Sequence, residues 1–80
     1  MLVAVTYTPR DTSEEKEKRS LALFSNWQRP AGYEEKAHYG MADGSGGIVI
    51  AEVSSDVALL EAMTPWGPFF DIKAVPIVEI

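Results

Sequence analysis

The stretch that decides the fold is YEEKAHYGMADGSGGIVIAEV, residues 33–53. Two strand-like runs, residues 33–42 and 48–53, flank the turn sequence Asp-Gly-Ser-Gly-Gly at residues 43–47. An Asp-Gly pair between two such runs is typical of a hairpin, and five intervening residues favour a loop longer than the two-residue type. The two runs are therefore predicted to pair as antiparallel neighbours.

Upstream of this hairpin, the sequence predicts a strand and then a helix. Residues 2–8 are rich in β-branched and aromatic side chains and stop at Pro9, which cannot donate a hydrogen bond to a neighbouring strand. Thr12 and Glu15 have the spacing of a capping box, so a helix is predicted over residues 13–27, before an Arg-Pro-Ala-Gly breaker. The large apolar residues lie only in the second half of this helix, so only that half is expected to be anchored in a core.

Downstream of the hairpin, the sequence predicts a second helix and a last strand. The capping residues Ser-Ser-Asp precede a helix predicted over residues 57–64. Pro65 ends it, because the residue before a proline is pushed out of the helical region. Residues 69–80 are predicted to form a strand that carries Pro76. Since proline is confined to edge strands or bulges, this strand is placed at the rim of the sheet.

The predicted order of elements is β-α-β-β-α-β, in one domain over residues 1–80. With a right-handed crossover from the first strand to the third, this order gives the ferredoxin-like arrangement. The expected fold is therefore α+β. It consists of a four-stranded antiparallel sheet with strand order 4-1-3-2 and two helices on one face.

The predicted strands are apolar on both of their faces. In the first strand, Leu2 and Ala4 lie on one side and Val3 and Val5 on the other. Two helices cover only one face, and a chain of 80 residues rarely gains more than ~3–5 kcal/mol from its own core. A second copy laid on the open face by two-fold symmetry, burying ~1,600 Å² or more, is the simplest cover. The sequence therefore predicts a homodimer.

Composition and charge exclude several classes of function. The net charge is -5, from seven Lys and Arg against twelve Asp and Glu, and the basic residues are scattered, which argues against a nucleic-acid partner. No apolar run reaches the ~20 residues of a membrane span, and no signal sequence opens the chain, so a cytoplasmic protein is expected. The absence of cysteine removes disulfides and thiolate chemistry. One histidine among scattered carboxylates predicts no metal site, and no cofactor is expected.

Three segments carry a resemblance to a known family: residues 1–8 (MLVAVTYT), residues 36–47 (KAHYGMADGSGG), and Pro-Trp at residues 65–66 before the last strand. Together they resemble a small bacterial family catalogued only as a domain of unknown function. That family is assigned to the dimeric α/β-barrel superfamily, and the likeness covers nearly the whole chain. The architecture is more distantly similar to cofactor-free antibiotic-biosynthesis monooxygenases and muconolactone isomerases. The resemblance implies the fold and a dimer, and it carries no assigned reaction.

His38 is the first candidate for chemistry, because it is the only histidine and imidazole transfers protons near neutral pH. Strict alternation along the strand divides its residues between two faces. One face holds Glu34, Lys36, His38 and Gly40, and the other holds Tyr33, Glu35, Ala37, Tyr39 and Met41. If the first face points into the cavity between the two sheets, His38 can meet Tyr7 or Trp66 there. The alternative is a lone histidine on a half-exposed edge strand, hydrogen-bonded or solvated.

The expected function is to bind a small, apolar or aromatic molecule between the sheet and the helices. His38, Trp66 and Tyr7 are expected to line the site, with Tyr39 and Phe69 as further ligand-binding candidates. The enzymatic alternative is a cofactor-free oxygenase or isomerase with His38 as general base and Tyr7 or Tyr39 donating a hydrogen bond to a developing oxyanion. A third alternative is a structural module whose interior is filled by side chains.

Overall fold

Four strands form one antiparallel sheet in the computed structural model, which describes residues 1–80. They are β1 (Leu2–Pro9), β2 (Tyr33–Gly40), β3 (Gly47–Val53) and β4 (Phe70–Pro76). Their order across the sheet is β2-β3-β1-β4, which is the predicted order 4-1-3-2 read from the opposite edge. Sheet order and strand directions are therefore as the sequence predicts.

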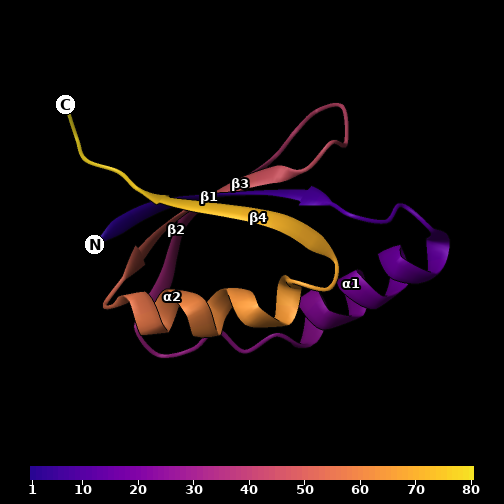
Figure 1. The fold of residues 1–80 in the computed structure, drawn as a ribbon, viewed down its shortest axis with the longest axis horizontal. Coiled ribbons are helices and arrows are strands. Elements are labelled where there is room, and N and C mark those ends of the chain that lie inside the picture. The colour runs from indigo at the N-terminus through magenta and orange to yellow at the C-terminus, as the bar shows by residue number, and fades with distance from the viewer.

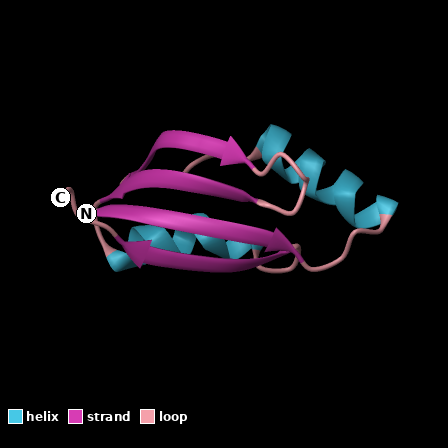
Figure 2. Ribbon diagram, turned by 90° about the horizontal axis from the view of Figure 1, so that it is seen from above, coloured by secondary structure: helices cyan, strands magenta, loops and turns pink.

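Two helices lie on the same side of this sheet. They are α1 (Glu14–Asn26) and α2 (Asp56–Met63), and α2 continues into a 3₁₀ turn, η1 (Thr64–Trp66). Figure 1 shows both helices below the strands, and Figure 2 shows α1 extending past the ends of the strands. The fold is ferredoxin-like α+β, as predicted. Neither helix combines the length and the apolar content that a membrane crossing requires.

The start of α1 differs in detail from the prediction. The predicted capping box of Thr12 and Glu15 is wrong, because Ser13 is the N-cap. The Ser13 hydroxyl accepts a hydrogen bond from the Lys16 amide at 3.3 Å, and the Asp11 carboxylate accepts one from the Ser13 amide at 2.8 Å. The cap is therefore one residue later than the capping-box spacing indicates.

The last strand is shorter than predicted. β4 ends at Pro76 rather than at residue 80, because its only neighbour, β1, begins at Leu2 and pairing runs out there. The Ile77 amide still donates to the Leu2 carbonyl at 2.9 Å, after which the chain leaves the sheet (Figure 1). β4 is an edge strand, so the predicted edge position of Pro76 is confirmed.

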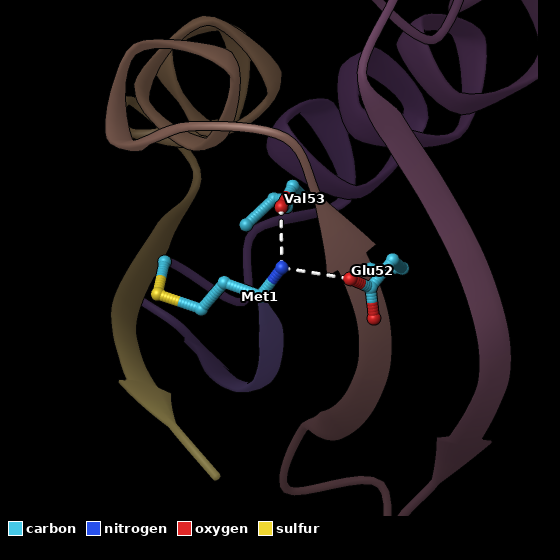
Figure 3. A network of polar contacts seen from close by, with 3 residues as sticks. All are labelled: Met1, Glu52 and Val53. Atoms are coloured by element: carbon cyan, nitrogen blue, oxygen red, sulfur yellow. Dashed lines mark hydrogen bonds and ion pairs between the residues drawn. The ribbon is translucent and has the colours of Figure 1, made fainter.

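The beginning of the chain is held against the end of β3. The amino group of Met1 donates to the Val53 carbonyl at 2.8 Å and forms an ion pair with the Glu52 carboxylate at 2.7 Å (Figure 3). These contacts extend the pairing of β1 with β3 by one residue. They lie at the end of the sheet away from the β2–β3 hairpin loop.

The core lies between the sheet and α2. It comprises Val3, Val5, Tyr33, Val49, Ala51, Val53 and Ala62, each at most 6% exposed. In contrast, α1 has no buried residue, and its side chains Leu21 and Phe24 are 64% and 44% exposed. The attachment of α1 comes from its C-terminal end, where Trp27 packs against the core.

A bulge in β2 changes which of its side chains face the helices. The β3 partners of Glu35 and Ala37 are consecutive residues, so Lys36 is an extra residue in β2. The bulge moves His38 onto the helix-facing side, together with Tyr33 and Glu35. The prediction that Tyr33 and Glu35 face away from His38 is therefore wrong, because strict alternation does not hold across a bulge.

Candidate functional site

A cavity of about 240 Å³ lies between the helix-facing side of the sheet and the two helices. Val5, Val49 and Ile72 contribute to it from three strands, and eleven of its thirteen lining residues are hydrophobic. Leu21 and Phe24 of α1 line it while remaining largely exposed, so they border its opening. The loose attachment of α1 thus leaves an apolar hollow open to solvent.

Aromatic rings form much of the cavity wall. Trp66, at the end of η1, has ring-centroid distances of 5.3 Å to Trp27, 6.1 Å to Phe24 and 6.0 Å to Phe70. Trp27 in turn lies 5.8 Å from Tyr33. These distances are typical of edge-to-face and tilted aromatic pairs, which hold one another in place. α2 ends at Met63, and Pro65 lies in the 3₁₀ turn that places Trp66 at the cavity.

A polar pair lies at one edge of this wall. The Tyr7 hydroxyl and Nε2 of His38 share a hydrogen bond of 2.6 Å, and their rings meet edge-on at 5.7 Å. Burial, and then the negative charge of Glu35, raise the pKa of Tyr7 above its usual value. The phenol therefore keeps its proton at neutral pH, and it donates to His38 when Nε2 is the unprotonated ring nitrogen.

The position of the Tyr7 ring depends on a glycine. Gly47 is the partner of Tyr7 across the β1–β3 pair. A Cβ at residue 47 would overlap the ring and hydroxyl of Tyr7. Because glycine has no side chain, the Tyr7 ring can lie across β3 and reach His38 on β2.

An ion pair flanks the cavity on the side of β2. The Arg29 guanidinium lies 3.3 Å from the Glu35 carboxylate, and their side chains are 39% and 19% exposed. The same guanidinium lies over the ring of Trp27 at 4.8 Å and that of Phe24 at 5.9 Å. Glu35 lines the cavity and Arg29 does not. The wall therefore carries a carboxylate whose charge is balanced from outside the cavity.

Tyr33 carries an unpaired polar group. The residue is 6% exposed and lines the cavity, and its hydroxyl oxygen is buried without a hydrogen-bond partner. Burial first, and then the negative charge of Glu35, raise the pKa of Tyr33 to about 12, although Arg29 opposes the rise. Leaving a buried polar group unpaired costs about 1–3 kcal/mol. The Tyr33 side chain thus carries a neutral hydroxyl that is shielded from solvent and makes no hydrogen bond.

The structure brings three of the five expected site residues together. His38, Tyr7 and Trp66 line the same cavity. Tyr39 does not, because it is adjacent to His38 in the strand and points to the opposite face, where it is 62% exposed. Phe69 lies beside a separate hollow near the start of α1, with the Lys16 ammonium 5.7 Å from its ring.

Sequence reasoning did not assign Tyr33 and Glu35 to the site. Strict alternation placed them opposite His38, and only the bulge at Lys36 reverses this. The second half of the first helix was expected to be anchored in a core. Trp27, just after this helix, does pack against the core, and Phe24 and Trp27 both line the cavity. Their three-residue spacing places both on one side of the helix end and could have indicated a shared wall.

The topology and the cavity define a ferredoxin-like α+β protein with an aromatic hollow beneath its sheet. The whole chain, residues 1–80, matches the family described as Domain of unknown function (DUF3303), and the protein belongs to this family. A search of curated proteins finds no match. Because a fold and a family of this description assign no activity, function has to be argued from the cavity itself.

Proposed function

We propose that the protein binds a small, largely apolar aromatic molecule in the cavity between the sheet and the helices. The observation that carries the proposal is the cavity of about 240 Å³, which is open to solvent and has aromatic rings over much of its wall. Apolar cavities of about 150 Å³ are known to bind benzene. The larger volume here suits a molecule of about two fused rings. The space left among the lining rings favours a binding role over a side-chain-filled structural module.

The opening of the cavity supports the same proposal. Leu21 and Phe24 are 64% and 44% exposed at its border. An occupant would remove part of this apolar surface from water, at about 25 cal/mol per Å². The free protein therefore leaves apolar area available for a ligand to cover.

Naphthalene is the probe that tests this proposal. The only two tryptophans, Trp27 and Trp66, both line the cavity, so their indole N–H signals in a nitrogen-edited NMR spectrum report on occupancy. Both signals are expected to shift saturably on titration. Ile72→Phe, which adds volume inside the cavity, is expected to abolish saturation. Its matched control is Val57→Phe on α2, at a side chain that is 63% exposed and does not line the cavity, which is expected to bind as the wild type does. Absence of saturable shifts in the wild type would overturn the proposal.

A second candidate function is cofactor-free catalysis, as an oxygenase or isomerase. The observation that favours it is the 2.6 Å hydrogen bond between Tyr7 and His38 at the cavity edge. With Nε2–H of His38 donating to the Tyr7 oxygen, Nδ1 of His38 would accept a proton from a substrate carbon, and the Tyr7 hydroxyl would donate a hydrogen bond to the oxygen on which charge develops. Tyr39 has no part in this scheme, because it lies on the other face of the sheet.

Exchange of deuterium from solvent into the methyl group of 2-acetonaphthone tests the second candidate, because this exchange needs a base and oxyanion stabilisation. Catalysis predicts exchange faster than in buffer, and its loss in His38→Ala with the affinity for naphthalene retained. Exchange at the buffer rate with wild-type protein would argue against His38 as a base. Parallel loss of exchange and of naphthalene binding in His38→Ala would assign His38 to binding.

We also propose that the protein is a homodimer through the open face of the sheet. No helix covers this face (Figure 2). The apolar side chains on it are Leu2, Ala4, Ile48, Ile50 and Val75. A sheet face of this composition in a single chain is typical of a surface that packs against a partner. The resemblance to the dimeric α/β-barrel superfamily favours a second copy, related by two-fold symmetry, as that partner.

A further inference from the structure

We propose that α1 is a hinged cover that moves toward the sheet when the cavity is occupied. This device rests on the proposed function, because it controls access to the same cavity. Three features of α1 carry it: free space beneath the whole helix, attachment only at the ends, and exposed apolar side chains at the border of the cavity.

Free space lies beneath both halves of α1. The cavity borders the second half through Leu21 and Phe24. The separate hollow near the start of the helix, of about 330 Å³, borders the first half through Lys16 and Ser20. Leu21 and Phe70 line both spaces, so the two are adjacent. Because protein interiors are normally close-packed, a helix above two hollows is not fixed by packing and has room to move inward.

The C-terminal end of α1 is one of its two attachments. Trp27 packs against the core there. Just beyond it, the Arg29 guanidinium lies over the Trp27 ring at 4.8 Å and forms an ion pair with Glu35 of β2 at 3.3 Å. These contacts hold the end of the helix on the sheet, so this end is the pivot of the proposed movement.

The other attachment precedes the helix. The Arg10 amide donates to the Phe69 carbonyl at 3.0 Å, which fixes the chain at the end of β1. Between the two attachments, no hydrogen bond or ion pair connects residues 11–28 to any other part of the chain. Figure 2 shows α1 extending past the ends of the strands. A shift of the helix toward the sheet therefore breaks no polar contact.

An occupant of the cavity supplies the driving force for this shift. Leu21 and Phe24 are 64% and 44% exposed at the border of the cavity. When an apolar molecule fills the space below them, inward movement removes their apolar area from water in proportion to the area covered. In the empty protein the same movement covers less area, because these side chains face an unfilled space. A ligand that makes more contact with the closed arrangement shifts the population toward it, and the second hollow narrows as a result.

The reactivity of a thiol in the second hollow tests this movement. The chain contains no cysteine, so Ser20→Cys introduces the only thiol, in the second hollow and outside the cavity. Its alkylation by iodoacetamide is expected to slow about tenfold at saturating naphthalene, because the closed arrangement shields it. Lys18→Cys is the matched control, at a side chain that is 75% exposed and lines neither space. Its alkylation is expected to proceed at the same rate with and without naphthalene.

Amide hydrogen exchange in the wild type guards against an effect of the substitution itself. Residues 17–20 lie in α1 and do not line the cavity, and their exchange is expected to slow when naphthalene binds. If the indole signals of Trp27 and Trp66 shift saturably while exchange at residues 17–20 or alkylation of Ser20→Cys is unchanged, closure is overturned and the proposed function stands. Absence of saturable shifts in the wild type removes both.

A double variant shows whether naphthalene acts from within the cavity. Ile72→Phe fills the cavity, so in Ser20→Cys combined with Ile72→Phe naphthalene is expected to leave the alkylation rate unchanged. Slower alkylation with naphthalene in the double variant would show that naphthalene shields the thiol from outside the cavity, and it would overturn closure.

Discussion

Among single residues, Tyr33 is expected to lower the stability of the fold through its unpaired hydroxyl. Its buried hydroxyl lacks a partner in the free protein, so Tyr33→Phe removes a desolvated group without breaking a hydrogen bond. The free energy of unfolding at neutral pH is expected to rise by about 0.5–1 kcal/mol. Urea unfolding measures this, and a loss of stability would indicate a hydrogen bond to Tyr33 in solution.

Tyr33 also predicts how stability depends on pH. Its pKa is about 12 in the folded protein, whereas a tyrosine of an unfolded chain ionises near pH 10. Between about pH 10 and about pH 12 the unfolded chain loses this proton first, so the free energy of unfolding falls as pH rises. In Tyr33→Phe, the decrease in the free energy of unfolding between these pH values is expected to be smaller than in wild type by about 2 kcal/mol. Equal falls in the two proteins would contradict the assignment to Tyr33.

Two glycines that face each other across β2 and β3 give a matched pair of tests. A Cβ at Gly47 would overlap Tyr7, whereas one at Gly40 meets nothing within 4 Å. Gly47→Ala is therefore expected to displace the Tyr7 ring, change the NMR signals of the His38 ring and lower the free energy of unfolding by about 1–3 kcal/mol. Gly40→Ala is expected to leave both measurements close to wild type. Similar effects of the two substitutions would exclude the ring overlap as the cause.

At the scale of elements, α1 depends on its cap more than on its packing. It has no buried residue, and its ion pairs Glu14–Lys18 and Glu15–Arg19 are exposed, so they contribute little. Ser13→Ala is expected to weaken the first turn by about 1 kcal/mol, seen as roughly fivefold faster amide hydrogen exchange there. Thr12→Ala is the control and is expected to leave exchange unchanged. Faster exchange in Thr12→Ala, with unchanged exchange in Ser13→Ala, would instead support the predicted capping box of Thr12 and Glu15.

At the scale of the whole molecule, the open face of the sheet predicts the state of association. Light scattering at micromolar concentration is expected to give twice the 8.8 kDa mass of one chain. Ile50→Lys places a charge in the middle of that face and is expected to give a monomer. Leu60→Lys, on the helix layer at a side chain that is 68% exposed, is the control and is expected to remain a dimer. A wild-type mass of one chain would contradict the proposal.

Local signals along the chain were enough to predict the architecture. The Asp-Gly turn, the proline stops and the runs of β-branched residues act over a few neighbours, so the strands, their order and the edge position of Pro76 could be derived from them. The end of β4 could not be derived from local signals, because it is set by the position at which its partner strand β1 begins. The cap of α1 was missed by one residue, since two adjacent hydroxyls compete for the same orphan amides.

By itself, the sequence determined the ferredoxin-like topology, the two-sided apolar strands, and the presence of His38, Tyr7 and Trp66 as candidates for one site. The tertiary structure alone decided which side chains share the cavity. The bulge at Lys36 is set by pairing with β3, and it turns Tyr33 and Glu35 toward His38. A one-residue change of register exchanges the faces of a strand, and nothing local to residues 33–40 specifies where that change occurs.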